Sequence, residues 1–281
     1  MNINSIKSFA KVNLALNITG KLTKLHKIES IIAFVSLYDL ITIKRINSKK
    51  HNISFNGNFS KNISRNNTVK NLFDILDRQK LLDDKKFQIK IKKNIPQEAG
   101  LGGGSMNAAN ILNFLMKKNI IKINQKKILK ITNLIGSDVI LGINPKSTVL
   151  TSSNVIKKFS RTPILHILLV RPNFGCSTKK IYSGVKRFTR PAFNNPKQNM
   201  FSIKFLSKQK NALEKITFLK YPKLKKLKSY LENLEKPLFV RMTGSGSVLV
   251  AYYLKKQDCE LAKEQFKRKF KNYWCNASKT I

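Results

Sequence analysis

Apolar and polar positions along the chain follow two alternating periods, one typical of strands and one typical of helices. Ser8–Ile18 alternates apolar with polar or small residues, and Glu29–Ile43 is rich in Ile, Val and Phe, so both segments predict strands. Phe87–Ile91 alternates strictly and predicts another strand. Apolar residues three and four apart follow Asn67 and again Ser105, which predicts two helices in a mixed α/β arrangement.

The second half of the chain predicts a further set of elements. Helices are expected over Gln125–Ile135, Thr178–Tyr182, Pro222–Leu234 and Asp258–Phe270, and strands over Ile164–Arg171, Pro237–Met242 and Val248–Leu254. A stretch rich in Lys and Asn at 187–210 predicts a loop and a helix. No composition change marks a linker, and a polar turn at Ser152–Asn154 is the one indication of a boundary. We therefore expect two domains, 1–155 and 156–281.

The bulk composition is that of a globular protein. The chain has 281 residues, of which 42% are hydrophobic and 9% aromatic. No apolar run reaches the roughly 18 residues of a spanning helix, and the beginning of the chain lacks the pattern of an export signal. Cys176, Cys259 and Cys275 are scattered and without metal-ligand spacing. A cytoplasmic protein without a membrane partner is the expectation.

The net charge of +41 has two explanations. Binding to nucleic acid through counterion release is one. A general enrichment in Lys, Asn and Ile is the other, and it is favoured because lysines occur in nearly every polar stretch, as in Lys92–Ile95. No basic segment interleaved with aromatics of the RNA-binding type is present. Specific nucleic-acid binding is therefore not expected, although a positive field would attract anionic small molecules.

A glycine-rich loop stands between the strand ending before Pro96 and the helix beginning near Ser105. Its sequence is Gly100-Leu101-Gly102-Gly103-Gly104-Ser105. Glycines allow a close backbone approach to a phosphate, and the following helix directs free N–H groups towards it. A Walker A loop would require Gly-Lys-Ser/Thr, and a dinucleotide fingerprint would require glycine at position 105. Neither is present, so a phosphate loop of another class is predicted, with packing of helix on sheet as the alternative.

Residues along the whole chain, in order, resemble one family. Pro96-x-x-x-Gly100-Leu101-Gly102-Gly103-Gly104-Ser105-x-Asn107-Ala108-Ala109 resembles the phosphate loop of the galactokinase, homoserine, mevalonate and phosphomevalonate (GHMP) kinases. Other segments are similar to the 4-diphosphocytidyl-2-C-methyl-D-erythritol kinases within that superfamily: Ala10–Leu14, Gly20-Lys21 with His26, Ile135–Val139, Ser177-Thr178 with Tyr182, Asn211–Glu214, Tyr221-Pro222 and Met242–Gly246. Each segment alone is weakly specific, and the ordered set is specific.

The resemblance implies an α+β, two-domain GHMP kinase fold with the active site in the cleft between the domains. It implies ATP-dependent phosphorylation, with Mg²⁺, of the C2 hydroxyl of a cytidyl erythritol substrate in the non-mevalonate isoprenoid pathway. Asp138 would be the general base, and Lys11 would stabilise charge on the transferred phosphoryl group. From the residues alone, Asp138 could instead cap a turn after Gly136. Lys11 lies among apolar residues of a predicted strand, an unusual place for a solvated charge.

The resemblance also assigns binding residues. Pro96, Gly100, Leu101, Gly102, Gly103, Gly104, Ser105 and Asn67 would bind ATP, with Asn67 near the adenine. Asn13, His26, Thr178 and Tyr182 would bind the substrate, with Tyr182 stacked on cytosine. A structural hydrogen bond is the rival interpretation for Asn13 and Asn67. An ordinary half-buried tyrosine is the rival for Tyr182, and helix capping is the rival for Ser105.

Departures from the family pattern concern the cytidine end. The family's Asp-Gly-Tyr-His turn is replaced here by Lys24-Leu25-His26, so Leu25 stands where a second aromatic would stack on cytosine. This motivates an alternative, a homoserine- or mevalonate-type small-alcohol kinase. A basic nucleic-acid-binding protein on a related scaffold is a third hypothesis, although RNA binding would not require Lys11, Asp138 and the loop together. A monomer or weak homodimer is expected.

Overall fold

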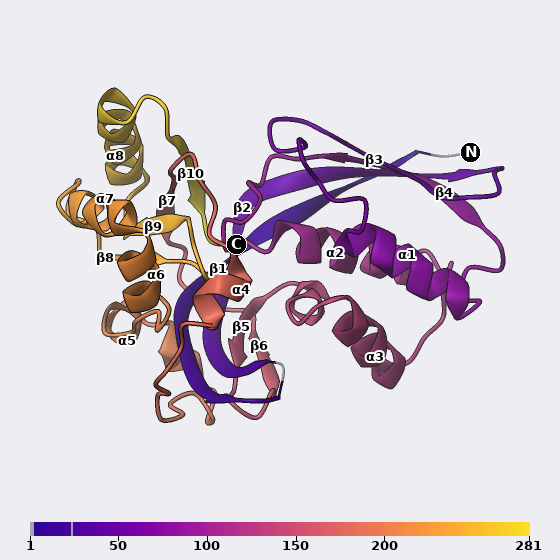
Figure 1. The fold of residues 1–281 in the computed structure, drawn as a ribbon, viewed down its shortest axis with the longest axis horizontal. Helices are drawn as coiled ribbons and strands as arrows, with labels where there is room; N and C mark the ends of the chain where they lie inside the picture. The colour runs from indigo at the N-terminus through magenta and orange to yellow at the C-terminus, as the bar shows by residue number, and fades with distance from the viewer. Residues whose placement is uncertain (1–2, 24) are drawn as a thin grey trace. The chain divides into compact units, whose positions relative to one another are not determined.

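The computed structural model describes residues 3–23 and 25–281, and its chain forms two compact units (Figure 1). Unit 1 contains the described residues up to Ala10, then Leu37–Pro96 and Gly102–Pro145. Unit 2 contains Lys11–Ser36, Gln97–Leu101 and Lys146–Ile281. The two units are thus discontinuous in sequence, and a single division at residue 155 stays a prediction. Lys24, in the turn before His26, lies outside the described residues.

Unit 1 is a helix-covered sheet. It takes the first part of β1 (Asn4–Lys21) and the second part of β2 (His26–Ile46), and also β3 (Asn52–Asn56), α1 (Thr68–Arg78), β4 (Lys86–Lys92), α2 (Gly103–Lys117), α3 (Gln125–Ile135) and the short 3₁₀ helix η1 (Val139–Gly142). β4 pairs antiparallel with β2 and parallel with β3. The helices lie against one face of these strands (Figure 1).

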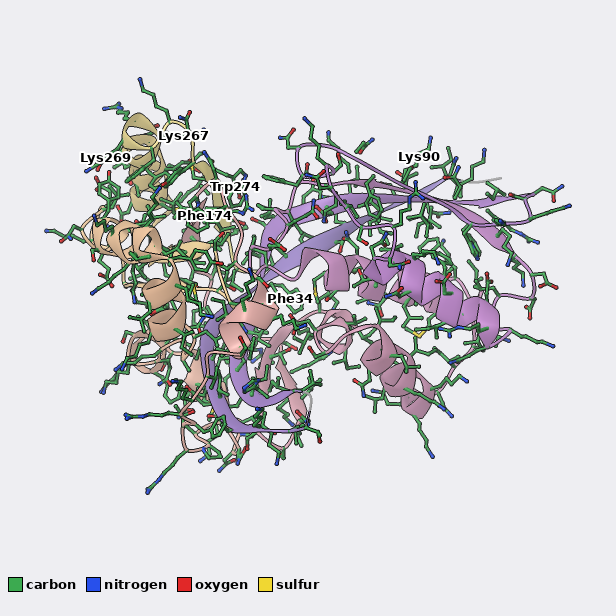
Figure 2. The ribbon with its side chains drawn as sticks, in the orientation of Figure 1. Phe34, Lys90, Phe174, Lys267, Lys269 and Trp274 are labelled. Atoms are coloured by element: carbon green, nitrogen blue, oxygen red, sulfur yellow. The ribbon has the colours of Figure 1, made fainter. Side chains whose placement is uncertain are left out.

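The alternation of apolar and polar residues in the strands explains why the helices cover one face of the sheet. In β4, and at Ile41 and Ile43 of β2, alternate positions are apolar and buried, and they meet the apolar stripes of α1 and α2. The core comprises Ile41, Ile43, Ile89, Ile91, Leu72, Phe73, Leu76, Ile111 and Leu112, among others. The outward positions are polar, and Lys90 of β4 is exposed to solvent (Figure 2). Burial of the apolar faces fixes the two helices on the sheet that carries them.

Unit 2 is built on a four-stranded antiparallel sheet in the order β10-β7-β9-β8. These strands are β7 (His166–Arg171), β8 (Phe239–Met242), β9 (Leu249–Tyr253) and β10 (Trp274–Lys279). Unit 2 also takes the second part of β1 and the first part of β2. Its other elements are β5 (Ser147–Leu150), β6 (Ile156–Phe159), α4 (Thr178–Tyr182), η2 (Gln198–Phe201), α5 (Ile203–Ser207), α6 (Glu214–Lys220), α7 (Pro222–Glu232) and α8 (Lys256–Lys269). Apolar residues of α7 and α8 share one core with the sheet, including Leu227, Leu231, Phe266, Leu168 and Ala251.

Most expected elements are confirmed, including the helix over Gln125–Ile135. Glu29–Ile43 belongs to one long strand, β2, which passes from unit 2 to unit 1. The short elements β3, β5, β6, η1, α6 and β10 were not predicted. Of these, β3 does alternate, as Asn-Ile-Ser-Phe-Asn, but its Asn and Ser residues are typical of turns.

The basic side chains are distributed over both units. Lys90 lies on β4, and Lys267 and Lys269 lie on α8, all three exposed (Figure 2). This distribution agrees with a general lysine enrichment rather than a single basic patch. Among the described residues, no helix is long and apolar enough to cross a membrane.

Candidate active site

The glycine loop leads into the free N-terminus of α2. Gly102 is the N-cap residue of α2, with a left-handed backbone at φ 69°, and Gly100 has φ 73°. No side chain caps this helix, and the first helical bond joins the Met106 N–H to the Gly102 carbonyl at 2.9 Å. The N–H groups of Gly103, Gly104 and Ser105 therefore have no carbonyl within the helix. Together with the helix dipole, they form a site suited to a phosphate.

Close packing explains some of the glycines independently of any phosphate. A Cβ on Gly100 would lie 2.0 Å from the Thr243 carbonyl oxygen, and a Cβ on Gly103 would lie 3.0 Å from the Ile95 side chain. Gly102 needs its positive φ. The number of glycines thus does not by itself indicate phosphate binding. The observation that favours it is the start of α2 directly after this loop, where three N–H groups have no carbonyl within the helix. The missing side-chain cap is not specific by itself, because α6, α7 and α8 also lack one.

The start of α1 is tied to the start of α2. The Thr68 hydroxyl donates a 2.7 Å hydrogen bond to the carbonyl of Gly104. Asn67 caps α1, since its Oδ1 accepts from the N–H groups of Val69 and Lys70 at 3.1 and 3.0 Å. The structural role weighed for Asn67 in the sequence is therefore present, and its contact with adenine stays a prediction.

A buried carboxylate lies in β2 of unit 1. Asp39 is fully buried and accepts hydrogen bonds from the N–H groups of Asn94 and Ile95, at 2.8 and 2.9 Å, and from the Asn107 amide at 2.9 Å. It also forms an ion pair with Lys93. Neither Asp39 nor Lys93 was predicted from the sequence to belong to the site. An acid among apolar residues of a predicted strand, in a chain with only 14 acids, was the available indication.

In unit 2, Lys11 and Asn13 form a second buried polar group on β1. Both are 4% exposed, and the Lys11 ammonium donates to the Asn13 Oδ1 at 2.7 Å. That oxygen also accepts from the Gly244 N–H at 3.0 Å, while the Asn13 amide donates to Ser30 at 2.8 Å. The backbone N–H of Lys11 donates to the carbonyl of Leu101 at 3.0 Å. Asn13 thus has the structural role considered for it, and it orients a buried ammonium.

Asp138 lies in unit 1 between α3 and η1. The chain leaves α3 at Gly136, and the Asp138 carbonyl accepts from the Leu141 N–H at 3.2 Å. Asp138 occupies the N-cap position of η1, yet its side chain makes no capping hydrogen bond. The turn-capping alternative is therefore wrong for this carboxylate. Its side chain is half-buried.

Three rings gather around the start of β2 in unit 2. The His26 ring centroid lies 5.3 Å from that of Tyr182 and 6.5 Å from that of Phe188. Phe188 is 48% exposed and Leu25 is 64% exposed. Burial, followed by the charge of Lys21, holds the pKa of His26 below its usual value, so its ring is neutral at pH 7. Phe188, which sequence reasoning missed, supplies an exposed aromatic face beside His26.

Thr178 lies at the start of α4, in the same unit. Its side chain is exposed, and its hydroxyl lies 2.9 Å from that of Ser245, in the Gly244–Gly246 turn. Asn13 holds the same turn through the Gly244 N–H. Two of the residues expected to bind substrate, Asn13 and Thr178, therefore contact one turn.

Known proteins match both units. The model of the GHMP kinases N terminal domain matches residues 67–145, and that of the GHMP kinases C terminal domain matches residues 189–272. The 4-diphosphocytidyl-2-C-methyl-D-erythritol kinase of Pelagibacter ubique (strain HTCC1062) is 57% identical over 281 residues, covering 100% of both chains. The chain belongs to the GHMP kinases. The similarly named kinase of Petrotoga mobilis (strain DSM 10674 / SJ95) is 32% identical over 254 residues, 87% of this chain and 96% of its own.

Solved structures of GHMP kinases share the fold. A crystal structure of 4-(cytidine 5'-diphospho)-2C-methyl-D-erythritol kinase matches with a TM-score of 0.80 at 21% identity, covering 99% of each chain. Homoserine kinase from Cytophaga hutchinsonii matches with a TM-score of 0.71 at 15% identity, covering 99% of this chain and 94% of that one. The expected α+β GHMP kinase fold is confirmed. The residues that match the GHMP kinases N terminal domain, 67–145, include the glycine loop and Asp138.

Proposed function

We propose that this GHMP kinase transfers the γ-phosphoryl group of ATP to the C2 hydroxyl of 4-diphosphocytidyl-2-C-methyl-D-erythritol. The observation that carries the proposal is the full-length, 57% identity to a kinase of that name. Homoserine kinase shares the fold at only 15% identity, and this likeness does not favour homoserine as the substrate of this chain. RNA binding is not favoured either, because it would not require the uncapped helix and the buried ammonium together.

Binding of ATP is proposed for the first turn of α2. The N–H groups of Gly103, Gly104 and Ser105 point out of the helix end and carry partial positive charge. The Ser105 hydroxyl stands in the same turn and adds a donor for a phosphate oxygen. Phosphoryl transfer requires mainly positioning and charge neutralisation, which these groups provide.

Proton removal is assigned to Asp138. The carboxylate accepts the proton of the C2 hydroxyl as the hydroxyl oxygen attacks the γ-phosphorus, and ADP leaves with the electron pair of the broken P–O bond. Asp138 lies within the residues that match the GHMP kinases N terminal domain, in the segment Ile135–Val139 that resembles the kinase family, and this supports the assignment. Lys11 contributes a fixed positive charge for the transferred group, oriented by its hydrogen bond to Asn13.

Mg²⁺ would accompany ATP and neutralise phosphate charge. Within residues 3–23 and 25–281, no group of three or more His, Cys, Asp or Glu side chains could hold a metal ion by itself. The ion would be carried mainly by the phosphates, and the Ser105 hydroxyl would contact a phosphate or a water bound to Mg²⁺. The binding of ATP and substrate between the two domains stays a prediction.

Recognition of the cytidyl group is proposed for the ring cluster at His26. Tyr182 and Phe188 present aromatic faces, and a base stacked on such a face contributes about 1–3 kcal/mol. The neutral His26 ring is able both to donate and to accept a hydrogen bond. Thr178 adds a hydroxyl at the neighbouring α4 N-terminus.

The Asp138→Asn variant tests the proposal. We expect wild type to release ADP only with the cytidyl substrate, and kcat of the variant to fall about 10²–10⁴-fold with ATP affinity nearly unchanged. A coupled ADP assay and ³¹P NMR of the product would measure this. Asp74→Asn, at a partly exposed pair with Lys70, is the matched control and should retain wild-type kcat. Phosphorylation of homoserine or mevalonate instead would contradict the substrate, and full activity of Asp138→Asn would contradict the base.

A further inference from the structure

Asp39 is a fully buried carboxylate surrounded by four hydrogen-bond donors. Its two oxygens accept from Lys93, from the backbone N–H groups of Asn94 and Ile95, and from the Asn107 amide. The side chain is 0% exposed, and that of Lys93 is 5% exposed. A buried charge is tolerated only when it is paired and hydrogen-bonded, as it is here.

The donors come from two segments that border the glycine loop. Lys93, Asn94 and Ile95 follow β4 and directly precede Pro96, where the chain enters the loop. Asn107 lies on α2, four residues after Gly103, where the chain leaves the loop. One carboxylate therefore fixes the entrance to the loop and the helix at its exit in the same unit.

Two further contacts direct this group towards the start of α2. A Cβ built on Gly103 would lie 3.2 Å from the Lys93 Nζ, so the ammonium lies directly against the first residue of the helix. The Asn107 Oδ1 is buried without a partner, while its amide is used by Asp39. That orientation leaves a buried acceptor unsatisfied, which costs free energy. The Asn107 amide is held by its 2.9 Å bond to Asp39.

We propose that Asp39 is a positioning residue for ATP: through Lys93–Ile95 and Asn107 it holds the start of α2 in the orientation that binds phosphate. The inference rests on the proposed function. It follows from geometry, because the N–H groups of Gly103–Ser105 are fixed to the helix axis and move with it. Electrostatic binding by aligned dipoles requires that they be held before the ligand arrives.

A purely structural role makes a different prediction. Loss of a buried ion pair would lower the melting temperature and the active fraction, so the apparent kcat would fall while KM for ATP stayed constant. A positioning role raises KM for ATP and weakens equilibrium binding of the nucleotide in protein that is still folded. Whether the loss of Asp39 changes KM for ATP or only the apparent kcat therefore distinguishes a positioning role from a structural one.

The decisive variant is Asp39→Asn, which keeps the shape but places an amide against the donors of Lys93 or Asn107. We expect the Kd of a non-hydrolysable ATP analogue, and KM for ATP, to rise about tenfold or more. KM for the cytidyl substrate should change by less than about twofold. Asp77→Asn is the matched control, since Asp77 also pairs with a lysine of unit 1, Lys86, while its other side-chain partner is His51 and neither lies in the loop or in α2. It should leave ATP binding unchanged.

Asn107→Ala is the second variant, for use if Asp39→Asn does not fold. It removes one of the four bonds and also removes the unpartnered oxygen. We expect a rise of about threefold to tenfold in the Kd for the ATP analogue, with folding retained. Equal binding by wild type and the variants would overturn the inference alone. Failure of wild type to bind the analogue would overturn the proposed function, and this inference with it.

Discussion

The hydroxyl of Thr68 donates a 2.7 Å hydrogen bond to the carbonyl of Gly104, and so joins the first turn of α1 to the first turn of α2. The N-termini of both helices therefore lie side by side within unit 1. Asn67, the residue before Thr68, caps α1. The Asn67 Oδ1 is engaged at the start of α1, one residue before the Thr68 hydroxyl that contacts Gly104, and its amide donates to the carbonyl of Ser64 at 3.0 Å.

Asn67→Ala separates a capping role from a nucleotide-binding role. Removing a cap costs about 1 kcal/mol of helix stability. Asn124 caps α3 in the same unit, accepting from the Lys127 N–H at 2.9 Å, so Asn124→Ala is the matched control. We expect both variants to lower the melting temperature to a similar extent. Only Asn67→Ala should raise KM for ATP, by about threefold or more. Thermal unfolding and initial-rate kinetics measure the two effects. If KM for ATP is equal in the two variants, Asn67 acts only as a cap.

Protonation of His51 should destabilise unit 1. Burial is the largest cause that holds the pKa of His51 below its usual value, against the hydrogen bond and charge of Asp77. Its Nδ1 accepts from the Phe87 N–H at 3.0 Å, and a proton there would put two donors face to face. In the unfolded chain histidine has a pKa of about 6.5. Between the folded pKa and this value the unfolded state binds more protons, so stability is complete above about pH 6.5 and is lost as the pH falls below it.

Thermal unfolding between pH 7.5 and 5.5 measures this dependence. We expect the melting temperature of wild type to fall over that range, and to fall less in His51→Gln, which retains a donor and an acceptor but does not titrate. The same slope in both proteins would mean that other groups cause the pH dependence. A melting temperature that rises on acidification would show that the Asp77 contact outweighs burial.

The ring cluster at His26 predicts selective effects on the cytidyl substrate. Phe188→Ala removes an exposed ring, so stability should change little, while KM for the cytidyl substrate rises about fivefold or more through lost stacking. Tyr182→Ala should act in the same direction. Leu261→Ala on α8 is the control of equal exposure, 49% against 48% for Phe188, and should leave all kinetic constants unchanged. An unchanged KM for the cytidyl substrate in Phe188→Ala would place the base elsewhere.

The local pattern of capping and apolar residues was sufficient to predict the longer helices and strands from the sequence. The capping residue Asn67 and the apolar positions Leu72, Phe73 and Leu76 predict α1, and Gly136 predicts the end of α3. Local pattern was insufficient for β10 and for β5. Neither Trp274–Lys279 nor Ser147–Leu150 alternates clearly, and each becomes a strand because a distant partner, β7 or β2, offers hydrogen bonds. Short strands owe their existence to such pairing.

For the candidate site, the sequence determined the glycine loop, the strand carrying Lys11 and the helix end before Asp138, because backbone conformation and apolar periodicity are local properties. Only the tertiary structure decided which polar groups meet. It paired Asp39 with Lys93 and Asn107, oriented Lys11 through Asn13, and brought Phe188 to His26. Each of these contacts joins side chains whose positions depend on the packing of β strands or on a loop, and a buried charge can be matched with its partner only after the core around it has formed.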